Sequence, residues 1–225
     1  MIIVIDGPAG AGKSTTAREI ARQTGFDYVD SGAIYRGLTY LFTVCGNDQF
    51  EFLEKIQSHG LRFDFKGTEA RVFNRGREIT RDIRSGVIND HVSRVAAMPE
   101  VREVVRGILR EESGNRNVVL EGRDLGTDVF PDADLKFFLT ADQKARARRR
   151  YDESIEKGES VTYEEVLQNV EKRDRIDSTR AVAPLKKADD AIEIDSTSMT
   201  FDEQVTRIME HIRSKRTGSG DNLTI

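Results

Sequence analysis

The chain has 225 residues and a formal net charge of −4 at neutral pH. That length can bury a substantial hydrophobic core, either as one large α/β domain or as a core with a smaller lobe, and the acidic balance argues against binding a nucleic-acid polymer through bulk charge. Cys45 is the single cysteine, which excludes an intramolecular disulfide and a cysteine-based zinc cluster, and the histidines His59, His91 and His211 follow no metal-ligand spacing.

The first predicted strand runs directly into a glycine-rich stretch. Residues 2–5 are a β-branched run typical of a buried parallel strand, and Asp6 ends it. Residues 7–14 fit the P-loop pattern G-x-x-x-x-G-K-[ST], and residues 14–23 predict a helix. Strand, loop and helix in this order aim backbone N–H groups and the positive end of the helix dipole at a phosphate. The sequence therefore predicts a nucleoside-triphosphate site.

Two side chains at the end of this loop carry chemistry. Lys13 is expected to reach the β- and γ-phosphates, and the Ser14 hydroxyl is expected to coordinate Mg²⁺. The alternative is a plain glycine turn between a strand and a helix, with Lys13 solvated. The flanking strand and helix favour the nucleotide site.

Residues 28–30 predict a second strand that leads into a helix running toward Val44, with Ser31 as a plausible N-cap. Ligands of open α/β sheets bind at the carboxyl ends of the strands, so this junction is expected to face the site. Arg36 has the forked guanidinium group that suits a phosphate. Without the neighbouring P-loop it would be interpreted as a surface arginine.

A small antiparallel insertion is predicted after a helix over residues 47–59. Residues 61–65 alternate apolar and polar, residues 70–74 do so more weakly, and residues 78–80 form a short third piece. Turn signals separate the three pieces. The insertion's own residues suggest no chemistry, so we expect it to be structural or lid-like.

The α/β pattern then returns. Residues 84–111 predict two helices separated at Met98, with Pro99 in the first turn of the second. Gly122 and the charged residues Arg123 and Asp124 directly follow a predicted strand, at the edge of the sheet where ligands bind. Three strands, a terminal helix and a disordered polar tail are predicted over residues 117–121, 135–139, 191–195, 201–213 and 217–225.

Two helices between the last two strands are rich in basic residues. The first, residues 141–156, carries Lys144, Arg146, Arg148, Arg149 and Arg150. The second begins at a capping box formed by Thr162 and Glu165 and runs to about residue 179.

Arg173, Asp177 and Arg180 are spaced to share one face of that second helix. On an isolated helix an ordinary ion-pair ladder would explain them. Here the helical hairpin follows the strand predicted beside the P-loop, which favours a lid that clamps phosphates. Such a lid supplies arginines to the loose transition state of phosphoryl transfer and excludes water.

Five stretches of the chain, in order, resemble bacterial cytidylate kinases: residues 6–14, 30–36, 93–97, 122–127 and 180–185. The resemblance extends from residue 2 to about residue 212 and includes the insertion. It implies an α/β fold: a P-loop kinase core with a mostly parallel five-stranded sheet flanked by helices, a small antiparallel inserted lobe and a helical lid.

The same resemblance divides residues 1–216, a single kinase unit, into three parts. The core comprises residues 1–30, 114–140 and 184–216. A lobe that binds the nucleoside monophosphate spans about 31–113, and the lid spans about 141–183.

The activity implied by the resemblance is transfer of the γ-phosphoryl group of ATP, with Mg²⁺, to CMP or dCMP in pyrimidine nucleotide metabolism. ATP would be bound by Gly7, Pro8, Ala9, Gly10, Ala11, Gly12, Lys13, Ser14 and Thr15. Ser93, Arg102 and Asp124 would face cytosine, and Asp177 would contact the ribose. The acceptor phosphate and the transferred group would be surrounded by Ser31, Arg36, Arg123, Arg173 and Arg180, and the catalytic residues would be Lys13, Arg123, Arg173 and Arg180.

These base-reading roles are chemically sensible. A carboxylate accepts a hydrogen bond from the N4 amine of cytosine, and an arginine donates to O2 and N3. Uracil presents the O4 acceptor instead, which would place lone pairs against the Asp124 charge. Ile176 stands where some relatives carry another lid arginine, so the charge of this lid is expected to be lower.

Other functions remain as alternatives. A P-loop GTPase would need an Asn-Lys-x-Asp motif, which this sequence lacks. A P-loop kinase with a UMP/CMP, AMP or small non-nucleotide acceptor, and a nucleotide-binding module without turnover, are separated from a CMP kinase by testing a panel of acceptors. Because the sequence shows neither a signal peptide nor an apolar run that could span a bilayer, we expect a soluble cytoplasmic protein, which in the absence of a coiled coil we expect to be monomeric.

Overall fold

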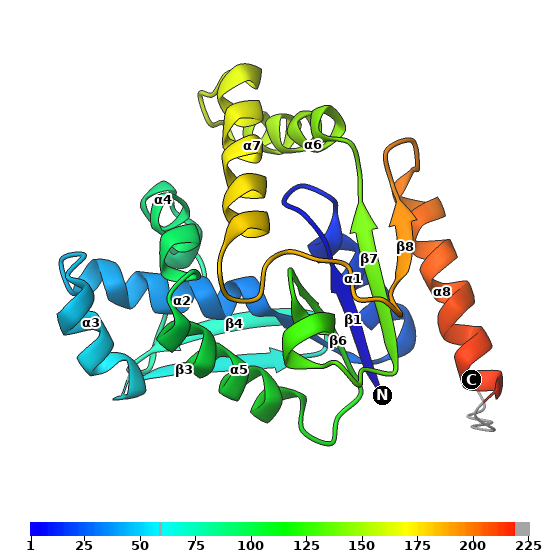
Figure 1. Ribbon diagram of the computed structural model, residues 1–225, viewed down its shortest axis with the longest axis horizontal. Helices are drawn as coiled ribbons and strands as arrows, with labels where there is room; N and C mark the ends of the chain where they lie inside the picture. Colours follow the sequence, from blue (N-terminus) through cyan, green and yellow to red (C-terminus); the bar gives the residue numbers. More distant parts are fainter. Residues whose placement is uncertain (59, 219–225) are drawn as a thin grey trace.

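The computed structural model describes residues 1–58 and 60–218 of the chain and is built around a five-stranded parallel sheet (Figure 1). Its strands are β1 (Ile2–Asp6), β2 (Asp27–Asp30), β6 (Val118–Gly122), β7 (Leu135–Thr140) and β8 (Ile192–Asp195). The order across the sheet is β2-β6-β1-β7-β8, with β1 paired to β6 on one side and to β7 on the other. Because all strands are parallel, their carboxyl ends meet at one edge. The predicted sheet is confirmed.

Alternate residues of β1 supply two hydrophobic cores, one on each face of the sheet, as the two-residue period of a strand requires. Ile3 and Ile5 pack in the core formed with α1 (Lys13–Thr24) and α8 (Phe201–Gly218). Val4 packs in the core on the other face, formed with α2 (Ser31–Val44) and α5 (Pro99–Ser113).

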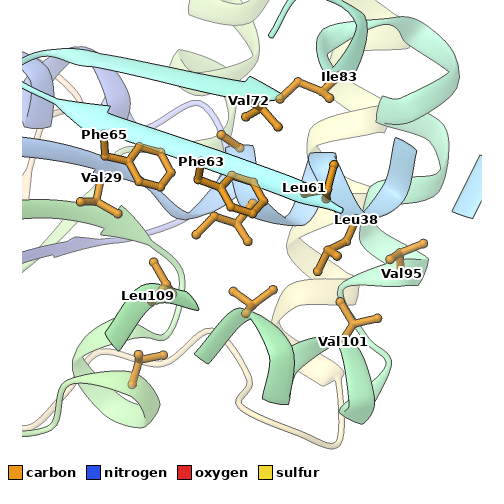
Figure 2. Close-up of a cluster of buried hydrophobic side chains, with 14 of the residues drawn as sticks. Val29, Leu38, Leu61, Phe63, Phe65, Val72, Ile83, Val95, Val101 and Leu109 are labelled. Carbon is orange, nitrogen blue, oxygen red and sulfur yellow. The ribbon is translucent and has the colours of Figure 1, made fainter. Parts of the chain in front are cut away.

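The predicted antiparallel insertion is present as β3 (Leu61–Lys66), β4 (Glu69–Asn74) and β5 (Arg77–Glu78). The last strand begins earlier and is shorter than the predicted piece over 78–80. Phe63 and Phe65 of this sheet share a core with Val29 and Leu38 of the main fold (Figure 2). The insertion therefore has no separate core and is seated directly on α2.

Between the small sheet and the main sheet the chain is mainly helical. A short 3₁₀ turn, η2 (Asp82–Arg84), precedes α4 (Gly86–Val95), and Pro99 lies in the first turn of α5 as predicted. The helix predicted over 47–59 is α3 (Gln49–Lys55) followed by a 3₁₀ turn, η1 (Ile56–Ser58), and residue 59 lies outside the described residues. A π-helical turn, η3 (Leu125–Val129), follows β6.

The predicted helical hairpin, α6 (Gln143–Glu156) and α7 (Tyr163–Thr179), stands over the carboxyl ends of the strands (Figure 1). Its capping box is confirmed, since the Thr162 hydroxyl accepts from the Glu165 N–H at 3.2 Å and the Glu165 carboxylate accepts from the Thr162 N–H at 2.7 Å. Arg180 has extended backbone just beyond α7, so only Arg173 and Asp177 share the helix itself.

The terminal helix is longer than predicted. α8 extends to Gly218, so the first two residues of the expected disordered tail are helical, and residues 219–225 lie outside the described part of the chain. None of the helices described combines the length and the apolar character needed to cross a bilayer.

Candidate nucleotide-binding site

A cavity of about 620 Å³ opens at the carboxyl edge of the main sheet, between the P-loop, α4 and the α6–α7 hairpin. Among the described residues that line it, ten lysines and arginines face four carboxylates. The positive excess suits a ligand that carries several negative charges, such as a nucleotide. Eight of the predicted acceptor-site residues line this cavity: Ser31, Arg36, Ser93, Arg123, Asp124, Arg173, Asp177 and Arg180.

The glycine-rich stretch adopts a conformation that other residues would resist. Gly10 and Gly12 have φ angles of 78° and 88°, in the left-handed region. A Cβ at Gly7 would collide with the backbone oxygen of Leu139. This turn ends at the N-terminus of α1, where unpaired backbone N–H groups and the helix dipole favour an anion. Of the predicted ATP-binding residues, Gly10, Gly12, Lys13, Ser14 and Thr15 line the cavity, and Gly7, Pro8, Ala9 and Ala11 form the rest of the turn.

Lys13 lies buried at the floor of the cavity. Its ammonium group donates to the Pro8 carbonyl at 2.8 Å. Burial, followed by the nearby charge of Arg123, lowers the pKa of Lys13 to about 7. An incoming phosphate would counter both effects, because an adjacent negative charge favours the ammonium form.

Sequence reasoning missed Glu121, a buried carboxylate at the end of β6. The Ser14 hydroxyl donates to it at 2.6 Å. The only signal in the sequence was an acidic residue at the end of a strand. Glu121 reaches the P-loop because it is paired with Ile5 in the sheet, and that pairing is known only from the structure. Because the Ser14 proton is directed at this carboxylate, the lone pairs of the hydroxyl oxygen stay available. Hard oxygen donors of this kind fit Mg²⁺.

Asp124, the predicted base reader, is buried against two arginines. Arg102 contacts one carboxylate oxygen, and Arg180 contacts the other at 2.8 Å. Burial raises the pKa of Asp124, opposed by the charges of Arg102 and Arg180. Arg102 is itself almost fully buried and lies behind the cavity wall. Asp124 does not pair with its chain neighbour Arg123, which pairs with Asp177 instead.

A second missed carboxylate positions the loop that carries Asp124. Asp6, at the end of β1, accepts the backbone N–H groups of Leu125 at 3.1 Å and Gly126 at 2.8 Å. Asp6 is 5% exposed, and burial raises its pKa to about 6 against the effect of these two hydrogen bonds. The strand that leads into the P-loop therefore also supports the far side of the cavity.

A cluster of guanidinium groups forms where the lid meets the end of β6. Arg123 pairs with Asp177 at 3.2 Å, and Arg180 lies 3.9 Å from the same carboxylate. The pKa of Arg173 is lowered, mainly by burial and next by the charges of Arg123 and Arg150. Such a cluster is electrostatically unfavourable without an anion.

Arg150, from α6, was noted in the sequence only as part of a basic helix. It lines the cavity, and burial is the first cause of the lowering of its pKa. Arg150 therefore adds a guanidinium group of the lid to the cavity, beside Arg173 and Arg180. Periodicity alone could not identify it among five basic residues of one helix.

Two neighbours of Arg150 connect the hairpin to the rest of the fold, and one of them, Arg149, also lines the cavity. Arg146 is buried, donating to the Ala9 carbonyl at 3.0 Å and to Asp174 of α7 at 2.7 Å. Arg149 donates to the Ser196 hydroxyl at 3.0 Å. These contacts tie the hairpin to the P-loop and to the edge of the sheet.

The N-cap predicted at Ser31 is wrong. Asp30 caps α2, because its extended backbone at the end of β2 lets its carboxylate accept the Ala33 N–H at 2.8 Å. The Ser31 hydroxyl instead donates to the Glu121 carbonyl at 2.7 Å.

Comparison with known proteins agrees with this geometry. The family model described as Cytidylate kinase matches residues 3–214. A protein named Cytidylate kinase from Caldanaerobacter subterraneus subsp. tengcongensis is 46% identical over 96% of this chain and 96% of its own length. Another of that name from Fusobacterium nucleatum subsp. nucleatum is 44% identical over 94% of this chain and 97% of its own.

Among solved structures, an uncharacterized protein from Eubacterium ventriosum covers 95% of this chain and 99% of its own, with a TM-score of 0.52 at 13% identity, which is a likeness of fold alone. On the strength of the family model and the full-length relatives, the chain belongs to the cytidylate kinase family.

Proposed function

We propose that this protein is a cytidylate kinase that transfers the γ-phosphoryl group of ATP to CMP or dCMP, giving CDP or dCDP and ADP. The family membership and the names of relatives 46% and 44% identical over nearly the whole chain support this activity. The observation that carries it is Asp124, a buried carboxylate on the wall of an arginine-rich cavity whose floor is a P-loop. Neither a simple triphosphate site nor a GTPase needs that carboxylate.

In the donor half, residues 7–15 hold the phosphates of ATP. Backbone N–H groups of the turn and the start of α1 bind phosphate oxygens, and Lys13 neutralises charge between the β- and γ-phosphates. Mg²⁺ would be held by the Ser14 hydroxyl together with phosphate oxygens, with Glu121 orienting that hydroxyl. The ion would supply charge neutralisation on the phosphates.

In the acceptor half, Asp124 accepts from the N4 amine of cytosine, and Arg102 and Ser93 bind other positions of the base edge. Asp177 binds the ribose. The acceptor phosphate and the transferred group are bound by Ser31, Arg36, Arg123, Arg173 and Arg180. The buried environment strengthens each of these charge-assisted hydrogen bonds.

Catalysis on this arrangement requires positioning and electrostatic stabilisation. The acceptor is already a phosphate oxygen, so no strong general base is needed, and Lys13, Arg123, Arg173 and Arg180 stabilise charge on the moving group. We assign the core to residues 1–30, 114–140 and 184–216, the acceptor lobe to about 31–113 and the lid to about 141–183. A monomeric state and a cytoplasmic location stay predictions.

The test is a panel of acceptors with ATP and Mg²⁺. ADP formation is measured without an acceptor and with CMP, dCMP, UMP or AMP. We expect rapid turnover with CMP and dCMP and much slower turnover with UMP and AMP. Equal rates with UMP would support a kinase of both pyrimidines, and ATP binding without acceptor-dependent turnover would support a nucleotide-binding module.

A further inference from the structure

The turn that follows the small antiparallel insertion carries an arginine into the acceptor half of the cavity. Arg84 ends the 3₁₀ turn η2, directly after the small antiparallel sheet, and lines the cavity beside Ser31 and Arg36. Sequence reasoning gave Arg84 no chemical role and placed it only at the start of the helical stretch over residues 84–111. The structure brings this turn to the same wall as the start of α2.

Arg84 and Arg36 share one carboxylate oxygen. The Nη2 atom of Arg84 lies 3.1 Å from Oδ2 of Asp30, and the Nη2 atom of Arg36 lies 3.2 Å from the same oxygen. The two nitrogens are therefore no farther apart than the sum of these distances. Two guanidinium groups held this close can contact a single phosphate together.

The shared carboxylate is committed elsewhere. Asp30 is 1% exposed and also accepts the Ala33 N–H at the N-terminus of α2. Burial opposes its ionisation, but the charges of Arg36 and Arg84 hold the pKa of Asp30 below its usual value. Three charged groups thus carry one net positive charge, beside a helix N-terminus that adds to it.

The two arginine side chains differ in how much of their surface is exposed to solvent. The Arg36 side chain is 18% exposed, whereas that of Arg84 is 48% exposed. Among the described residues, the Arg84 guanidinium group pairs with Asp30. Gly32 leaves room for this arrangement, since a Cβ there would lie 3.0 Å from Nη1 of Arg36 and 3.0 Å from Asp30.

We propose that Arg84 is a further ligand of the acceptor's phosphate group, acting beside Arg36, and that Asp30 is the positioning residue that holds both guanidinium groups. This proposal rests on the proposed function, because it assumes a nucleoside monophosphate in the cavity. It gives the turn after the insertion a chemical role: η2 delivers one phosphate ligand from outside the P-loop core.

The experiment compares CMP with cytidine, which lacks the phosphate. Dissociation constants for both are measured by calorimetry with Arg84→Gln, Arg84→Lys and the wild-type protein. The matched control is Arg81→Gln, on the preceding turn and outside the cavity lining. A lost charge-assisted hydrogen bond weakens binding by about tenfold or more. We expect that loss for CMP with Arg84→Gln, a smaller loss with Arg84→Lys, and unchanged cytidine binding and KM for ATP.

Unchanged CMP affinity in Arg84→Gln would overturn the proposal, as would an equal loss for CMP and cytidine, which is what a merely structural role predicts. Thermal unfolding shows whether each variant folds. If Arg84→Gln does not fold, Arg84→Lys decides the question by the same contrast between CMP and cytidine. Wild-type protein without CMP-dependent turnover would refute the proposed function itself, which is a different result from normal turnover in Arg84→Gln.

Discussion

Replacing Asp124 by asparagine tests whether this residue selects the base. The residue is 3% exposed, so water cannot screen the charge of its carboxylate from a bound ring. Uracil would place its O4 acceptor against that charge, whereas an asparagine can rotate to donate from its amide nitrogen. One base-edge contact of this kind is worth about 1–3 kcal/mol of discrimination, or roughly 5- to 150-fold. We expect the ratio of kcat/KM for CMP to that for UMP to fall by a factor in this range in Asp124→Asn.

The assay measures ADP formation over a range of CMP and UMP concentrations. Asp128→Asn is the matched control, because Asp128 lies on the π-helical turn that Asp124 caps, pairs with Arg106 at 3.0 Å and lies 3.8 Å from Arg102, but does not line the cavity. Removing the Asp124 charge leaves Arg102 and Arg180 without their shared partner, so the melting temperature must be checked. A folded Asp124→Asn protein with an unchanged CMP/UMP ratio would refute base reading by this residue.

Further predictions concern Lys13, Glu121 and Asp6. Lys13→Ala should abolish turnover in a folded protein. Because the pKa of Lys13 is about 7, ATP binding at pH 8 should take up a proton in the wild type but not in Lys13→Arg. Calorimetry in two buffers of different ionisation enthalpy measures this proton uptake. Glu121→Gln should raise the Mg²⁺ concentration needed for half-maximal tightening of ATP binding, and an unchanged Mg²⁺ dependence would contradict the orienting role. The pKa of Asp6, raised by burial from 3.8 to about 6, means that its stabilising contribution is complete below pH 3.8 and is lost as the pH rises through 6. Denaturant titrations should therefore show wild-type stability falling by about 1 kcal/mol relative to Asp6→Asn between pH 5 and pH 8, and parallel pH profiles would contradict this.

The features that sequence predicted well are local ones. The P-loop turn depends on glycines a few residues apart, and the capping box at Thr162 depends on Glu165 three residues later, so neither needs knowledge of the tertiary structure. The N-cap of α2 was mispredicted by one residue because Asp30 and Ser31 are both good caps. The strand backbone at Asp30 decided between them.

The residues that sequence missed are placed by the topology. Glu121 reaches Ser14 across 107 residues of chain, because β6 happens to be the neighbour of β1. Asp6 supports the Asp124 loop across a similar separation. Arg146 and Arg150 lie one helical turn apart on α6. The packing of α6 against the P-loop determines that Arg146 bonds to the loop backbone and that Arg150 lines the cavity.

The acceptor half is organised by three buried carboxylates that each hold two arginines. Asp30 holds Arg36 and Arg84, Asp124 holds Arg102 and Arg180, and Asp177 lies between Arg123 and Arg180. In each set the carboxylate offsets part of the repulsion between the guanidinium groups and fixes their directions. Arg180 belongs to the last two sets, so five arginines face three carboxylates and a net charge of +2 remains. The free-energy cost of bringing these charges together is therefore met during folding. A phosphate that enters finds donors already oriented, which is the condition under which electrostatic stabilisation accelerates phosphoryl transfer.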